Sequence, residues 1–359
     1  MDAFPNVEED NDLEEFLGHI EDDAFVYAPR IRLVDRGNPL DWYTDEEFFV
    51  RYRFHKVTVT DVLLPMLRPD NADLRGVPVP RFLQLLAVLR FYATGSFQIV
   101  AGDFHELAQS TMSRIIKVIS IEFAGKLPEV VKIPQSNEEL ATARNLFYRV
   151  AHFPGVVGCV DCTHIPITSP GGELAEVYRN RKGYFSLNVQ VVVGPRLEIL
   201  DIVCRWPGST HDARIFHNSR LRLRFDRDEV SGLLLGDSGY PQLRYLYTPV
   251  RNPATPAERR YNASHIATRS AVERAFGIWK RRFPCLSMKL RTATQTSAKI
   301  ILACAVLHNV AISQREPVPE NIHLEDPHAD VPIPAVQNRN LRATAERRAF
   351  INRHFARHQ

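Results

Sequence analysis

The sequence predicts an α/β protein in which a mixed sheet flanked by helices is preceded by an all-α domain. Two short apolar runs, residues 156–160 and 232–236, each lead directly into an aspartate and read as buried strands. Residues 185–191 alternate between apolar and polar side chains, as a strand exposed on one face does. After Pro80, by contrast, Phe82, Leu85, Leu86 and Leu89 recur at helical spacing.

Composition places the chain among globular intracellular proteins. Its 359 residues are enough for two or three sub-domains, and 45% of them are hydrophobic. No stretch approaches the roughly 20 uninterrupted apolar residues of a membrane span, so we expect no membrane partner. The first residues show no basic start followed by an apolar core, and no secretory signal is expected. Five cysteines in this length do not indicate a disulfide framework, which favours a reducing compartment.

Charge is distributed unevenly, although the net charge is only +3. No Lys or Arg occurs before Arg30, whereas ten acids lie between Asp2 and Asp23. From Tyr240 to Arg291 there are 11 basic residues against two acids. A basic half with an acidic arm indicates a polyanionic partner such as nucleic acid. The alternative is a solvated charged surface without a binding role.

The order of elements predicts six segments. Helices are expected at 45–54 and 59–67, after Pro80 and over 139–151, and strands at 156–167, 185–193, 197–205 and 232–236. A loop and short helix are expected near 212–218, and helices around Glu273 and over 300–310 close the sheet region. The segments are an acidic disordered arm (1–25), a helical domain (43–126), a connector and helix (127–154), the α/β domain (155–314), a Pro-rich linker (315–337) and a basic C-terminal helix (338–359).

The end of the helical domain has the pattern of a helix-turn-helix. Residues 95–104 lead to a turn at 105–108 and a second helix from Gln109, whose start is rich in small polar side chains. Met112, Ile115, Ile116 and Ile119 give this helix an apolar underside. An ordinary helical hairpin with a Ser or Thr cap is the alternative. The residues predicted to contact DNA are Ser110, Thr111, Ser113, Arg114 and Lys117.

Three acids are the candidate catalytic residues. Asp161 and Asp237 follow the two buried strands, where an unpaired charge is costly, and Glu273 lies on a predicted helix. Carboxylate oxygens suit Mg²⁺ or Mn²⁺, so we expect these acids to hold a divalent metal. Asp212 is the rival for the second position. It lacks a preceding apolar strand and is explained by a helix N-cap, so we assign it a supporting role.

Seven sequence blocks resemble the Harbinger family of DDE transposases, and most closely the transposase-derived nucleases of that family. They occupy residues 158–167, 180–190, 206–212, 235–241, 255–262, 272–277 and 307–309, in the family's order. The resemblance implies a ribonuclease-H-like catalytic domain, a preceding helix-turn-helix and a nuclease active on double-stranded DNA. It also implies target sites rich in T and A, a Myb-like DNA-binding partner and location in the nucleus, with the cytoplasm as a second site. A second copy of the chain is a further candidate partner.

In this reading Asp161 bridges two metal ions, Asp237 holds one and Glu273 the other, so that water or a 3′-hydroxyl can attack a phosphodiester. Basic residues near the acids are expected to contact DNA phosphates. They are Arg179, Arg181, Lys182, Lys280, Arg281 and Arg282.

Other readings compete with this one. Cys159, Cys162, His164 and Cys204 invite a zinc site, but the first two flank Asp161 on one strand and are better explained as buried small residues. His308 on an apolar helix is better explained as a hydrogen-bonded core histidine. The whole chain could instead be a domesticated, catalytically silent DNA-binding or scaffold protein, or a metal phosphatase acting on a small substrate. The helix-turn-helix and the basic half disfavour the phosphatase.

Overall fold

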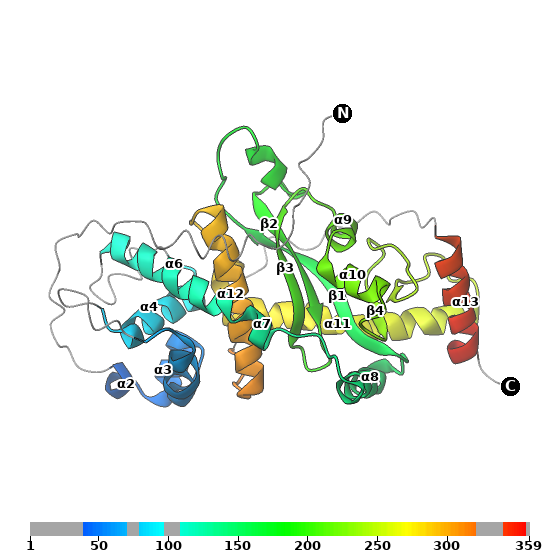
Figure 1. The fold of residues 1–359 in the computed structure, drawn as a ribbon, viewed down its shortest axis with the longest axis horizontal. Coiled ribbons are helices and arrows are strands. Elements are labelled where there is room, and N and C mark those ends of the chain that lie inside the picture. Colours follow the sequence, from blue (N-terminus) through cyan, green and yellow to red (C-terminus); the bar gives the residue numbers. More distant parts are fainter. Residues whose placement is uncertain (1–38, 70–78, 97–107, 321–339, 357–359) are drawn as a thin grey trace. The chain divides into compact units, whose positions relative to one another are not determined.

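A five-stranded sheet lies at the centre of the computed structural model, which describes residues 39–69, 79–96, 108–320 and 340–356 (Figure 1). The strand order is β3-β2-β1-β4-β5. β1 pairs antiparallel with β2, and β2 with β3, whereas β1–β4 and β4–β5 are parallel pairs. The predicted mixed sheet is therefore present. The strands are β1 (Val156–Pro166), β2 (Ser186–Val193), β3 (Ile199–Pro207), β4 (Leu233–Leu235) and β5 (Leu246–Tyr247).

β2 corrects one expectation, because every one of its residues is buried. The alternation of residues 185–191 predicted a strand exposed on one face. Its polar side chains point instead into the protein, where Ser186 contacts His164 and Asn188 donates to Asp212. Buried polar groups need such partners. The alternating pattern therefore marks a polar interior rather than a solvated face.

Helices cover both faces of the sheet. On one face, Cys159, Val191 and Leu235 belong to a hydrophobic cluster shared with α11 (Pro256–Arg282) and α12 (Thr294–Ser313). On the other face, Val160 and Leu234 pack in a second cluster with side chains of two short helices. These helices are α9 (Asp212–His217) and α10 (Arg220–Asp226). Figure 1 shows α11, drawn in yellow, crossing the strands.

The helical segment before the sheet follows the sequence prediction with one local difference. α3 (Asp45–Tyr52) begins with a capping box between Thr44 and Glu47, after the single turn of α2 (Pro39–Trp42), and α4 (Arg81–Thr94) begins after Pro80. The helix expected over 59–67 is a π-helix, η1 (Thr58–Leu63), followed by a 3₁₀ turn, η2 (Leu64–Met66). Pro65 has no N–H to donate, which interrupts a regular α-helical ladder here.

α6 (Gln109–Gly125) is the predicted second helix of the helix-turn-helix. Met112, Ile115, Ile116 and Ile119 are all buried, as its apolar underside requires, and α6 packs against α12. The turn and most of the preceding helix of the predicted motif lie outside the described residues, so the motif stays a prediction. After α6 come α7 (Leu127–Val130) and α8 (Asn137–Ala151), which has a capping box between Ser136 and Glu139.

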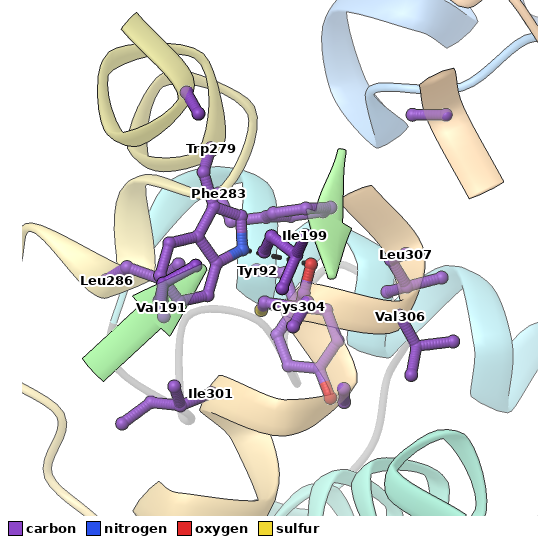
Figure 2. Packing of buried hydrophobic residues seen from close by; sticks show 14 of the residues in the cluster. Tyr92, Val191, Ile199, Trp279, Phe283, Leu286, Ile301, Cys304, Val306 and Leu307 are labelled. Carbon is purple, nitrogen blue, oxygen red and sulfur yellow. Dashed lines mark hydrogen bonds between the residues drawn. The ribbon is translucent and has the colours of Figure 1, made fainter. Parts of the chain in front are cut away.

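One hydrophobic core joins the helical segment to the sheet. Tyr92 of α4, Trp279 of α11 and Val191 of β2 belong to the same cluster (Figure 2). Within it the Trp279 indole N–H donates to the Cys304 carbonyl of α12 at 3.0 Å. By length and hydropathy α12 could cross a membrane, but 67% of its most apolar window is buried. It is a core helix of this unit, and all described residues belong to one compact unit.

The Leu-His-Asn block of α12 fixes the turn between β2 and β3. His308 is buried and its Nε2 atom lies 2.9 Å from the Leu197 carbonyl, which agrees with the expected core role. The Asn309 side chain accepts from the Ile199 N–H at 2.8 Å and donates to the Ile199 carbonyl at 2.7 Å. These two bonds replace the ladder bonds that edge strand β3 would make with a further strand.

The last helix, α13 (Leu341–Phe355), agrees with the predicted C-terminal helix and packs on α11. Phe355 contacts Phe153 and Tyr261, and its carbonyl accepts from Arg260 at 2.8 Å. The acidic arm at 1–25 and residues 321–337 of the predicted linker lie outside the described residues. The remaining short elements are the 3₁₀ turns η3 (Ala175–Tyr178) and η4 (Pro284–Leu286).

Candidate active site

Asp161 lies on β1, and Asp237 lies just beyond the end of the neighbouring parallel strand β4. Cys159 of β1 pairs with Leu235 of β4, and each aspartate lies two residues beyond its member of this pair. Residues two apart on a strand share a face, which places Asp161 with Cys159 on the side covered by α11. Asp161 lies within β1 rather than at its end, which corrects the expected strand-end position. Asp237 does follow the end of β4.

The Asp161 carboxylate has two donors. Its Oδ2 atom accepts from Arg269 Nη1 at 3.0 Å, and its Oδ1 atom accepts from the Cys162 N–H at 2.8 Å. Burial raises the pKa of Asp161 to about 7, against the lowering effect of Arg269. The negative charge of Asp237 raises this pKa as well, and that of Asp212 adds to it. Burial, and after it the neighbouring carboxylates, therefore disfavour the charged form of Asp161, and Arg269 opposes them.

Glu273, on α11, contacts the same arginine as Asp161 does. Arg269 precedes it by one helical turn, and Arg269 Nη2 lies 2.5 Å from Glu273 Oε1. One guanidinium thus links the strand acid to the helix acid. Burial acts to lower the pKa of Arg269, but the charges of Asp161, Glu273 and Asp237 outweigh it and the pKa is raised. The charges of the three predicted catalytic acids therefore all act on one cation.

Asp237 is held by the loop that follows β4. Its Oδ1 atom accepts from the Gly239 N–H at 2.9 Å. Burial raises the pKa of Asp237, opposed by this hydrogen bond and by Arg269, and the charge of Asp212 raises it further. A carboxylate with a raised pKa beside other carboxylates is a typical metal ligand that gains from a nearby cation.

Asp212 is only 8% exposed and lies on the opposite side of the sheet from Asp161. It is the first residue of α9, after N-cap His211, so the expected N-cap role is wrong. Its Oδ1 atom accepts from Asn188 at 2.9 Å. Asn188 pairs with His164 in the sheet register, whereas Asp161 pairs with Val191, and alternation separates the two faces. Asp212 acts on the other acids through its charge.

The cysteines do not converge. Cys159 Sγ lies 3.6 Å from the Thr268 carbonyl on the α11 side, whereas Cys162 Sγ lies 3.3 Å from the Tyr240 hydroxyl on the other side. Cys204 contacts the Ala298 carbonyl. Among the residues that the structure describes, no three His, Cys, Asp or Glu side chains are grouped closely enough to hold a metal ion. Asp161 and Glu273 are not grouped with each other because Arg269 lies between them and pairs with both.

Three of the predicted phosphate-binding residues gather near His164. Burial lowers the pKa of His164 to about 4, against the opposing charge of Asp212. The charges of Lys280, Lys182 and Arg181 lower it as well, so all three lie within electrostatic range of this imidazole. Arg181 is exposed, and the two lysines are half-buried.

The other three predicted phosphate-binding residues differ from one another. Arg281 is half-buried near the end of α11. Arg179 is exposed but engaged, because it pairs with Glu176 at 2.7 Å, donates to the Gly183 carbonyl and stacks on Phe185. For Arg282 the structure corrects the expected contact with DNA phosphates. It is 2% exposed and donates to the carbonyls of Arg53 and Pro317, so it holds the helical segment instead of contacting DNA.

The predicted DNA-reading side chains of α6 lie opposite its buried face. Ser110, Ser113, Arg114 and Lys117 are exposed and Thr111 is half-buried. Their spacing of three and four residues puts Ser110, Arg114 and Lys117 on one face of the helix. This arrangement fits a surface helix that contacts a partner, and its use for DNA stays a prediction.

Two residues of the site were not predicted from the sequence. The sequence could have indicated the Arg269–Glu273 pair, because Arg269 precedes Glu273 by four positions and side chains at this spacing face each other on a helix. Asn188 lay within one of the seven blocks, but its contact with Asp212 depends on α9 folding over β2. No local pattern reports that contact.

Comparison with known proteins identifies relatives over most of the chain. The family described as "DDE superfamily endonuclease" matches residues 160–309. The Homo sapiens protein named "Putative nuclease HARBI1" is 34% identical over 299 residues, which cover 81% of this chain and 84% of that protein. The Mus musculus protein of the same name is 32% identical over 351 residues, covering 93% and 97%. The Arabidopsis thaliana "Protein ALP1-like" is 25% identical over 280 residues, covering 73% and 68%. No solved structure matches.

Proposed function

The chain belongs to the DDE superfamily endonucleases of Harbinger transposase origin, and from this membership we propose that it hydrolyses phosphodiester bonds in duplex DNA at Asp161, Asp237 and Glu273. The observation that carries this assignment is that Arg269 contacts both Asp161 and Glu273, and that the charge of Asp237 acts on Arg269 as well. Asp161 lies on β1, Asp237 follows the adjacent parallel strand β4, and Glu273 lies on α11. Asp212, the rival, lies on the opposite side of the sheet.

The donor set fits a hard divalent cation such as Mg²⁺ or Mn²⁺. All three side chains offer carboxylate oxygens. The pKa values of Asp161 and Asp237 are raised first by burial and then by neighbouring carboxylates, and a bound cation would oppose both effects. Two divalent ions held there would activate the attacking water and stabilise the leaving oxygen. Asp161 would touch both ions, with Asp237 and Glu273 each holding one. A 3′-hydroxyl in place of water would turn cleavage into strand transfer.

The chain's own cations would position the DNA. Arg181, Lys182 and Lys280 lie near His164, on the same strand as Asp161. A phosphate backbone lying along them would be held by contacts of the kind that fix position without reading sequence. Sequence preference would come from α6, whose exposed face carries Arg114 and Lys117. We further propose a Myb-like partner and a nuclear location for the working complex.

A nicking assay with the full chain tests the proposal. With Mg²⁺ or Mn²⁺ the wild type should nick supercoiled plasmid DNA, and Asp161→Asn, Asp237→Asn and Glu273→Gln should each abolish nicking while duplex binding stays near the wild-type level. The amide keeps the shape and removes the charge that would hold the cation. Asp201→Asn is the matched control, since Asp201 is a strand aspartate whose pKa is raised by burial to about 6 but whose charged neighbours are Arg224 and Arg220.

Two results would redirect the assignment. If Asp212→Asn abolishes nicking and Asp237→Asn does not, the second carboxylate is Asp212. If the wild type binds duplex DNA and nicks it with neither cation, the chain is the alternative, a DNA-binding or scaffold protein that no longer cleaves.

A further inference from the structure

We infer that Arg269 is a positioning residue that serves as the built-in counter-ion of the acidic site and competes with a divalent cation for Asp161 and Glu273. The competition rests on the proposed function, whereas the counter-ion role stands on the ion pairs themselves. Arg269 is absent from the predicted set of catalytic and DNA-contacting residues, and it touches two of the three acids.

The geometry favours a fixed link over a passing surface contact. The Arg269 and Asp161 side chains are 16% and 17% exposed, and their atoms lie 3.0 Å apart. The second amino group of the same guanidinium reaches Glu273, whose side chain is 56% exposed. A planar guanidinium can hold two carboxylates at once in a fixed orientation, which a lysine cannot do. The strand acid and the helix acid are therefore held in position by one side chain.

Charge explains why such a link is needed. Asp161 and Asp237 lie side by side in a partly buried site, with Asp212 adding negative charge from the other side. Without a cation these groups repel one another, and burial adds to the cost of keeping Asp161 ionised. Arg269 offsets both effects, since the charges of Asp161, Glu273 and Asp237 all act on it.

The same contacts make Arg269 a competitor of a metal ion. A divalent cation bound by Asp161 and Glu273 would use the oxygens that Arg269 now contacts, and it would stand beside a like charge. Arg269 and the divalent ion cannot both contact these oxygens fully, so each lowers the affinity of the site for the other. Such coupling is reciprocal: removing the arginine should strengthen metal binding by the factor by which metal binding weakens the arginine's contacts.

The test compares Arg269→Gln with Arg274→Gln in the full chain. Arg274 lies on the same helix next to Glu273 and is exposed, so it controls for the loss of one positive charge. Thermal unfolding in EDTA at pH 8 measures the counter-ion role. Calorimetric titration with Mn²⁺ measures the competition without any cleavage readout. Arg269→Lys keeps the charge but not the two-pronged contact, and it replaces Arg269→Gln if that variant does not fold.

In EDTA, Arg269→Gln should melt below both the wild type and Arg274→Gln. Adding Asp161→Asn should cost less in the Arg269→Gln background than in the wild type, because the two side chains are coupled. Arg269→Gln should bind Mn²⁺ roughly fivefold or more tightly than the wild type, with Arg269→Lys between them.

The melting comparison and the Mn²⁺ titration can each contradict one part of the inference. Equal melting temperatures for Arg269→Gln and Arg274→Gln in EDTA would overturn the counter-ion role. An Mn²⁺ affinity that is unchanged or weaker in Arg269→Gln, with binding still measurable in the wild type, would overturn the competition alone. If neither the wild type nor any variant binds Mn²⁺, the competition and the proposed metal-dependent nuclease both fail, and the EDTA comparison still decides the counter-ion role.

Discussion

Asn188 donates a hydrogen bond from its side-chain Nδ2 atom to the Oδ1 atom of Asp212, 2.9 Å away, and a second one to the Thr210 carbonyl at 2.8 Å. This amide ties β2 to the start of α9 and orients an acid whose charge acts on both Asp161 and Asp237. Asp212 is thus part of the site's electrostatics without sharing the face of Asp161.

The first prediction concerns this link. Asn188→Ala should lower the free energy of unfolding by about 1–3 kcal/mol, because a buried carboxylate and a buried carbonyl each lose a donor. Asn188→Asp should cost at least as much, since it also places a second negative charge beside Asp212. Chemical denaturation at neutral pH measures both. A cost below about 0.5 kcal/mol for Asn188→Ala would show that Asp212 finds another donor.

The second prediction is a pH dependence of stability. The pKa of Asp161 is raised to about 7 from an ordinary value of 3.8, so the folded state holds this proton more tightly than the unfolded chain does. In EDTA the contribution of Asp161 to stability is therefore fully present below about pH 4 and is lost as the pH rises through about 7. Each tenfold difference in proton affinity between the folded and unfolded states corresponds to about 1.4 kcal/mol of this contribution.

The measurement is the difference in unfolding free energy between the wild type and Asp161→Asn from pH 4 to pH 8. Asparagine does not titrate, so effects of other groups cancel in the difference. Relative to this variant the wild type should lose stability across that range. A flat difference would mean that Asp161 titrates at its ordinary pKa in the folded protein.

The sequence was sufficient for the mixed sheet and for most helices, because these follow from apolar runs and local spacing. It was not sufficient for long-range environments. The alternation of β2 looks the same whether its polar face meets water or Asp212, and only the position of α9 distinguishes the two. The basic run at the end of α11 likewise gave no sign that Arg282 turns inward while Lys280 lies near His164.

The third prediction separates Arg282 from its neighbour Arg281. Arg282→Ala should lower the free energy of unfolding by about 3 kcal/mol or more, because the carbonyls of Arg53 and Pro317 lose a buried charged donor. Arg281→Ala, one residue earlier and half-buried, is the control and should cost much less. Denaturant unfolding of the two variants decides this. Similar losses would indicate that Arg282 contributes only as part of the helix.

The fourth prediction concerns the cations near His164. Changing Arg181, Lys182 and Lys280 together to Gln should weaken binding to every duplex and flatten the dependence of log K on log salt by up to about one unit per lost phosphate contact. Fluorescence anisotropy at several salt concentrations measures the slope. Arg179→Gln is the control, since Arg179 is already engaged by Glu176 and the Gly183 carbonyl and should change the slope little. An unchanged slope in the triple variant would place the DNA elsewhere.

The fifth prediction concerns α6 and the partner. Its exposed face offers Arg114 and Lys117 as cations, and a single module with so few basic residues seldom binds specifically at nanomolar concentration. The chain alone should therefore bind its preferred duplex weakly, and a Myb-like partner should restore tight binding and nuclear accumulation. Tight, specific binding by the purified chain alone would remove the need for that partner.

Within the complex, Arg114 and Lys117 should behave differently, because a guanidinium near the start of the helix can contact a guanine edge with two bonds whereas a lysine serves as a point charge for phosphate. Selection from a randomised duplex pool provides the preferred sequence. Arg114→Ala should then reduce the preference for that sequence over random duplex by about 1–3 kcal/mol. Lys117→Ala should weaken binding to both about equally. If Arg114→Ala also weakens both equally, α6 contacts only the phosphate backbone, and the sequence preference belongs to the partner.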